Sequence, residues 1–108
     1  MRQDQFDLIR QWATERGLYE NGDITTQFIK LAEEQGEFAR AFLHEDVPGQ
    51  IDAIGDMVIV LTNLAGIINL ANFHPLMDDL TIEKCIESAW SVIKDRKGSM
   101  KNGTFVKE

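Results

Sequence analysis

The stretch KLAEEQGE at residues 30–37 decides the fold, because it places three carboxylates within five residues of an otherwise amphipathic helical pattern. An apolar stripe recurs along the same predicted helix at Phe28, Leu31, Phe38, Ala39 and Phe42. Glu34 and Glu37 are three residues apart, so they project together from the edge of this stripe. The pair is therefore expected to face a groove beside the core.

A second acidic pair, Asp52 and Asp56, lies four residues apart immediately before the most apolar run of the chain. Two helices packed antiparallel would bring both pairs together. Carboxylates flanked by apolar residues are costly to bury unless they are paired or bind a metal. Ligand sets made only of oxygen suit Mg²⁺, with Mn²⁺ as a substitute. The two pairs together therefore favour a metal site over the solvated acidic face that a single such pair usually forms.

The order of these motifs resembles the MazG-like all-α nucleoside triphosphate pyrophosphohydrolases over nearly the whole chain. That family's pattern is Glu-Glu-x-x-Glu, a spacer and Glu-x-x-Asp, and Glu34, Glu37 and Asp56 match three of its four metal-ligand positions. Ala53 stands where the family has the remaining Glu. Asp52 lies about 40° from Asp56 around the helix axis, so we expect it to substitute as the fourth acidic group.

This resemblance implies Mg²⁺-dependent hydrolysis of a nucleoside triphosphate, in particular a deoxynucleotide, to the monophosphate and pyrophosphate. Glu33 or Glu34 would orient the attacking water toward the α-phosphorus. The sequence has no Walker-type glycine-rich loop and no recognisable Ser, Cys or His nucleophile motif. Two alternatives stay open: a phosphoribosyl-ATP pyrophosphohydrolase with the same chemistry, and a non-catalytic helical module for oligomerisation or partner binding.

Further side chains are candidates for substrate binding: Trp12, Gln27, Lys30, Asn63, Lys94, Arg96 and Lys97. Trp12 is either a core or interface aromatic or a platform for a nucleobase. Lys30 either pairs with Glu34 one turn later or reaches a phosphate. Asn63 is either a satisfied core amide or a donor to sugar or base. The basic residues after the last helix either complement its dipole or meet the triphosphate.

The hydrophobic pattern predicts one all-α domain over residues 1–108, an antiparallel four-helix bundle-like subunit with a tail at 98–108. The helices are expected at residues 4–16, at 24–44, between a break at 47–49 and about residue 73, and at 82–97. The boundary signals are Gly17, Asp23, the run Phe73-His74-Pro75, Thr81 and Gly98. A loop is expected around Tyr19, and Asn102-Gly103 would permit a tight turn in the tail.

The third helix is apolar nearly all round, so we expect a long buried central helix. One subunit of 108 residues cannot easily surround it, which predicts a homo-oligomer, dimer or tetramer, packed through its helices. Its most apolar run, residues 57–73, is shorter than the ~20 residues that a bilayer needs and contains several polar side chains. We therefore expect no membrane span.

The acidic composition limits the partners. A net charge of −7 and a pI near 4.7 argue against nucleic acid and anionic membranes, which require a basic surface. Cys85 is the only cysteine, which excludes an intrachain disulfide and a thiolate metal site and fits a reducing compartment. The first residues lack the apolar stretch of a signal peptide, and a cytoplasmic location is expected.

Overall fold

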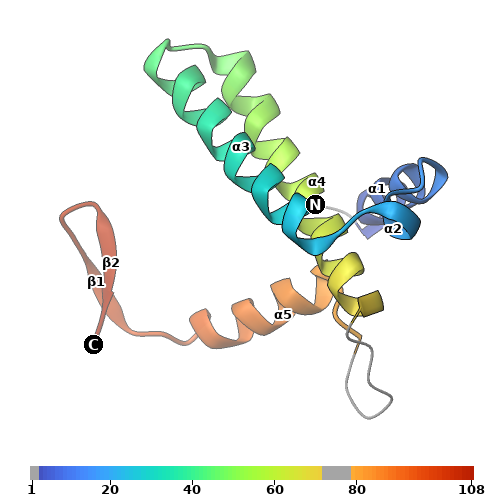
Figure 1. The fold of residues 1–108 in the computed structure, drawn as a ribbon. Coiled ribbons are helices and arrows are strands. Elements are labelled where there is room, and N and C mark those ends of the chain that lie inside the picture. The colour runs from blue at the N-terminus through green and yellow to red at the C-terminus, as the bar shows by residue number, and fades with distance from the viewer. Residues whose placement is uncertain (1–2, 72–78) are drawn as a thin grey trace.

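The computed structural model describes residues 3–71 and 79–108, which form a mostly helical chain that ends in a two-stranded hairpin (Figure 1). Its elements are α1 (Gln3–Glu15), α2 (Leu18–Asn21), α3 (Ile24–Leu43), α4 (Val47–Ala71), α5 (Ile82–Ile93), β1 (Gly98–Lys101) and β2 (Thr104–Lys107). The predicted helical character is confirmed, with the hairpin as an addition. The predicted stop at Phe73-His74-Pro75 lies outside the described residues.

The helices α3 and α4 form an antiparallel pair joined by a short turn, and Figure 1 shows them side by side. The turn uses Glu45 with a φ of 55°. The predicted break at residues 47–49 is wrong, because α4 already begins at Val47. Proline fits the first turn of a helix, where its missing N–H has no intrahelical partner. Asp46 caps the first turn of α4, because its carboxylate accepts a hydrogen bond from the Gly49 amide at 3.0 Å.

The N-terminal elements are separated by Gly17, whose φ of 79° lies in the left-handed region that favours glycine. The predicted stop of the first helix at this residue is therefore confirmed. The loop expected around Tyr19 is instead the short helix α2. Asp23 begins α3 as predicted, since its carboxylate accepts from the Thr26 amide at 2.7 Å.

The helix α5 begins at the predicted cap, where Thr81 accepts a hydrogen bond from the Lys84 amide at 3.1 Å. It ends at Ile93 rather than at the predicted Lys97. The chain then leads into a hairpin, in which residues 98–101 pair with residues 104–107 and the Lys97 carbonyl accepts a hydrogen bond from the Glu108 amide. The turn Asn102-Gly103 has φ values of 51° and 82°, as a tight hairpin turn requires. Figure 1 shows α5 leading away from α3 and α4, with the hairpin at its far end.

The buried apolar core is small and consists largely of alanine and single large side chains: Phe6, Ala13, Ala41, Ala53, Val60, Ala65 and Ile67. A single chain buries only one side of the central helix α4, because Ile51, Ile54 and Leu70 on α4 are exposed. The helix α4 has 25 residues and is longer than the apolar run at residues 57–73. Its length and composition would allow it to cross a membrane, but core helices of soluble proteins meet the same criteria.

An ion pair ties α5 to α1. The Arg10 guanidinium donates two hydrogen bonds to the Glu83 carboxylate, at 2.8 and 2.6 Å, and a third to Asp7 at 2.6 Å. Two parallel bonds of this kind are the strongest form of side-chain pairing. Hydrogen bonding to Arg10 holds the pKa of the Glu83 carboxyl below its ordinary value. The docking of α5 therefore depends on the charged form of Glu83.

We expect Glu83→Gln to lower the free energy of unfolding by about 1–2 kcal/mol at neutral pH, because the substitution replaces a charged acceptor with a neutral amide. Since the folded pKa is lowered, this stabilisation is present above the unfolded pKa and is lost as the pH falls through the folded pKa. Thermal melting at a series of acidic pH values checks both points, with exposed Glu87→Gln on the same helix as the control. Identical pH profiles for the wild type and Glu83→Gln would contradict the role of the pair.

Candidate metal centre and its pocket

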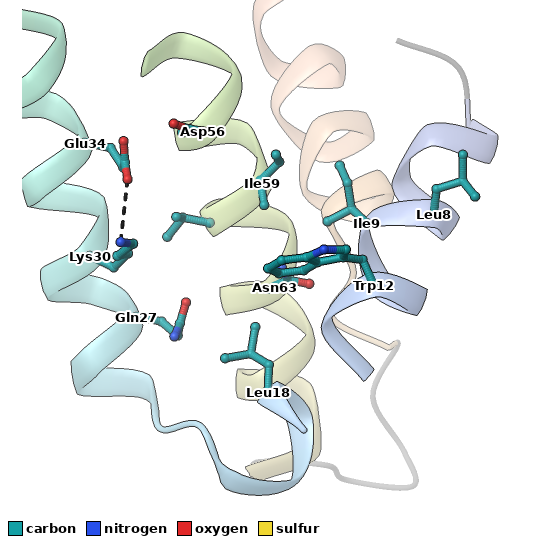
Figure 2. Close-up of a pocket in the computed structure, with 11 residues that line it drawn as sticks. Leu8, Ile9, Trp12, Leu18, Gln27, Lys30, Glu34, Asp56, Ile59 and Asn63 are labelled. Carbon is teal, nitrogen blue, oxygen red and sulfur yellow. Dashed lines mark ion pairs between the residues drawn. The ribbon is translucent and has the colours of Figure 1, made fainter. Parts of the chain in front are cut away.

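Three carboxylates meet between α3 and α4. Glu34, Glu37 and Asp56 each offer an oxygen atom, and these atoms all lie within 4.8 Å of one another. Glu34 and Glu37 share a face of α3 because they are one turn apart. The antiparallel return of α4 sets Asp56 opposite them, and Figure 2 shows Glu34 and Asp56 reaching into the same space from the two helices. The structure thus brings together the three residues that the sequence motif singled out.

Glu34 is the buried member of this group, with 5% of its surface exposed. One of its oxygens lies 3.8 Å from the Lys30 Nζ atom, an ion pair drawn in Figure 2. The other oxygen, Oε2, is buried and has no hydrogen-bond partner among the described residues. Burial, and then the charges of Glu37 and Asp56, raise the pKa of the Glu34 carboxyl. A buried carboxylate oxygen without a partner is costly, and a bound cation would satisfy it.

The acidic group opens onto a pocket of about 680 Å³ between α1, α3 and α4. Its lining residues are Leu8, Ile9, Trp12, Leu18, Gln27, Lys30, Glu34, Asp56, Ile59, Val60 and Asn63. Figure 2 shows the indole of Trp12 extending from α1 across α4 towards α3, with Gln27 and Lys30 on the facing helix. The pocket therefore combines a charged wall from α3 and α4 with an apolar wall from α1 and α2, to which Ile59 and Val60 of α4 contribute.

The pocket gathers four of the predicted substrate-binding residues: Trp12, Gln27, Lys30 and Asn63. The Trp12 ring is half exposed, and the Arg16 guanidinium lies 4.4 Å from its centroid. Lys30 makes the predicted pair with Glu34 while its side chain stays half exposed. Asn63 is buried and accepts a hydrogen bond from the Tyr19 hydroxyl at 2.7 Å. An aromatic face, a cation and two amides thus border one space.

Other predicted site residues lie elsewhere. Glu33 is exposed and does not line the pocket. Asp52 is exposed and outside the 4.8 Å group, but it borders a second pocket of about 330 Å³ together with Glu37 and Asp56. The basic residues Lys94, Arg96 and Lys97 follow α5, are exposed, and line neither pocket. The geometry within one chain therefore separates the basic cluster from the carboxylates.

The apolar wall of the pocket was missed in the sequence. Leu8, Ile9, Leu18 and Ile59 line it, yet each reads as an ordinary apolar residue of an amphipathic helix. Their role depends on how α1 and α2 pack against α4, which is a tertiary contact. Tyr19 gave a usable signal, because an aromatic hydroxyl between two glycines in a short connection is expected to find a buried partner.

Comparison with known proteins gives one partial match. No protein-family model matches the chain, and no solved structure gives a significant match. The chain is 40% identical over 57 residues to an uncharacterized 18.2 kDa protein in the rep-hol intergenic region of Haemophilus phage HP1 (strain HP1c1). The match covers 53% of this chain and 35% of the phage protein, about a third of its length. This similarity indicates a relative but no activity.

We expect Glu34→Gln to raise the melting temperature of the metal-free protein by a few degrees at neutral pH, because it removes a buried charge that Glu37 and Asp56 repel. We also expect Mg²⁺ to raise the melting temperature of the wild type by binding the native state, and Glu34→Gln should abolish this rise. Thermal melting in chelator and in excess Mg²⁺ checks both effects. Glu33→Gln, the exposed neighbour, is the control and should behave as the wild type. A Mg²⁺ response that survives in Glu34→Gln would exclude this carboxylate as a ligand.

Proposed function

We propose that this protein hydrolyses nucleoside triphosphates, in particular deoxynucleotides, to the monophosphate and pyrophosphate in a Mg²⁺-dependent reaction that serves house-cleaning of the nucleotide pool. One observation carries the proposal: the buried, unpartnered Glu34 oxygen stands beside Glu37 and Asp56 in the wall of a pocket that also presents Trp12. A triphosphate with its counter-ion suits the charged wall, and a nucleobase suits the apolar one. The resemblance of the acidic motifs to MazG-like enzymes supports the same reaction.

The ligand set fits a hard divalent cation. Glu34, Glu37 and Asp56 would hold Mg²⁺ or Mn²⁺ through carboxylate oxygens alone, as these ions prefer. When bound, the ion would neutralise phosphate oxygens and favour the ionisation of water. The unpartnered Glu34 oxygen is the feature of this chain that such an ion would complete. Asp52, on the far side of Asp56, is proposed as a fourth acidic group acting from the second pocket.

Other side chains of the pocket are proposed to bind the base and the phosphates and to activate water. Trp12 offers a half-exposed aromatic face, on which a base of any identity can stack. Lys30 keeps about half of its side chain exposed while paired with Glu34, so its ammonium can also contact a phosphate oxygen. Glu34 is the better placed of the two candidate bases, because Glu33 lies outside the pocket. Its carboxylate lies in the pocket wall, where it could accept a hydrogen bond from an attacking water.

We further propose that the subunits assemble into a homo-oligomer, a dimer or a tetramer, that completes the helical bundle in a cytoplasmic protein. Large apolar side chains remain exposed on α5, including Ile86 and Ile93, and Trp90 is 59% exposed. Apolar surface of this extent is a mark of a protein interface. Carboxylates on α4 such as Asp52 are costly in lipid, which favours a protein environment for that helix.

The proposed activity is tested by measuring pyrophosphate release from a panel of nucleoside triphosphates with and without Mg²⁺. We expect Glu37→Gln and Asp56→Asn each to lower turnover at least ~100-fold, since each removes a charged ligand without changing shape. Asp52→Asn should have a smaller effect that grows at limiting Mg²⁺. Glu33→Gln is the control and should retain activity. Release of pyrophosphate at the wild-type rate by Glu37→Gln would remove the proposed site.

The oligomer is tested by light scattering at micromolar concentration, where we expect a multiple of the 12.3 kDa subunit mass. Trp90→Glu should reduce the mass while the helical circular dichroism is retained, because this side chain is exposed within the subunit. Ile67→Glu should instead unfold the subunit, since Ile67 is only 6% exposed. A wild-type mass of one subunit would contradict the assembly.

A further inference from the structure

A hydrogen bond connects the short helix α2 to the pocket. The Tyr19 hydroxyl donates to the Asn63 Oδ1 atom at 2.7 Å. Asn63 is 2% exposed and lines the pocket, whereas Tyr19 lies outside the pocket lining. Burial raises the pKa of the Tyr19 hydroxyl, against the opposing charge of Arg10, so the group stays protonated and keeps donating at neutral pH. In this contact the Tyr19 hydroxyl is the donor and the Asn63 amide oxygen is the acceptor.

The position of Tyr19 depends on a glycine. A Cβ atom at Gly66 would lie 2.4 Å from the Tyr19 Cε1 atom and 2.8 Å from its hydroxyl oxygen. No real Cβ sits so close to another heavy atom, so the ring can occupy this place only against the bare backbone of α4. Gly66 follows Asn63 by three residues, about one helical turn. The helix α4 therefore supplies both Gly66, against which the Tyr19 ring packs, and Asn63, whose amide oxygen accepts from the Tyr19 hydroxyl.

This arrangement fixes which end of the Asn63 amide is available. Its oxygen accepts from Tyr19, and its Nδ2 group donates to no residue in the described part of the chain. The nitrogen is the other branch of the same planar group, so it is the atom that Asn63 offers to the pocket. The Nδ2 atom is not one of the buried side-chain atoms without a partner in the described residues, so it keeps contact with solvent. A ligand acceptor in the pocket would replace that solvent.

We propose that Tyr19 is a positioning residue that locks the Asn63 amide with its N–H donors toward the pocket, so that the site selects a nucleobase with a ring carbonyl over one with an amino group at the same place. The inference rests on the proposed nucleotide substrate and names its chemical class. The Trp12 indole would stack on the face of the base, and the edge of the base would be free to hydrogen-bond with the Asn63 amide. An amino group on that edge would face two donors and find no acceptor there, whereas a ring carbonyl would accept a hydrogen bond from them.

The test measures binding rather than turnover, by calorimetry in Mg²⁺ with α,β-imido analogues of dUTP and dCTP, which differ at ring position 4 as carbonyl and amino group. We expect the wild type to bind the dUTP analogue about tenfold more tightly. Tyr19→Phe keeps the ring and removes the hydroxyl, so the amide can turn over and the ratio should fall below about threefold. In hydrolysis of dUTP, the same variant should raise KM and leave kcat near the wild-type value.

Two further variants separate positioning from loss of structure. Gly66→Ala should displace the ring and reproduce the loss of selectivity, and combining it with Tyr19→Phe should add little, because both act on the same contact. Glu20→Gln, an exposed change on the same short helix, should keep the tenfold ratio. Thermal melting establishes that each variant is folded before the ratio is compared.

The outcomes distinguish this inference from the proposed activity. Equal binding of the two analogues by the wild type, tighter binding of the amino analogue, or an unchanged ratio in Tyr19→Phe overturns the positioning role of Tyr19. A wild type that keeps the ratio but releases no pyrophosphate from any triphosphate supports the positioning role and overturns the proposed hydrolysis instead.

Discussion

The burial of Glu34 between α3 and α4 is the constraint on which the rest of the structure depends. A carboxylate enclosed beside Glu37 and Asp56 suffers both the loss of its hydration and the repulsion of like charges, and Lys30 offsets only part of this cost. The packing that encloses it is the same antiparallel contact that buries Ala41 and Ala53. The fold therefore cannot form its core without also forming the acidic group, and a cation that neutralises the group would stabilise both.

The acidic group could be predicted because only local rules are needed to build it. Helical spacing sets Glu34 and Glu37 on one face, and a short turn forces α4 to return antiparallel, which brings Asp56 opposite. The caps at Asp23 and Thr81 were equally predictable, since each contacts an amide three residues later. The error at Pro48 has a local cause too: proline read as a break is also a favoured first-turn residue.

The features that escaped prediction depend on contacts between distant segments. After the last helix, residues 98–101 pair with residues 104–107, and the periodicity of residues 82–97 gives no sign of this pairing. For the basic residues that follow α5, the sequence left open whether they complement the helix dipole or contact the triphosphate. In one subunit they do not line the pocket, since α5 leads away from α3 and α4. Likewise, the apolar wall of the pocket exists only once α1 and α2 pack against α4, with Gly66 making room for Tyr19.

The two walls of the pocket therefore have different structural origins. The charged wall is fixed by the core contact of α3 with α4, so it cannot change without disturbing the fold. The apolar wall comes largely from α1 and α2, which make fewer contacts with α4 than α3 does, among them the hydrogen bond from Tyr19 to Asn63. Substitutions in α1 and α2 can reshape what the pocket accepts while the acidic group is preserved. In the proposed function, chemistry and recognition would thus be built on separable parts of one small chain, joined at α4.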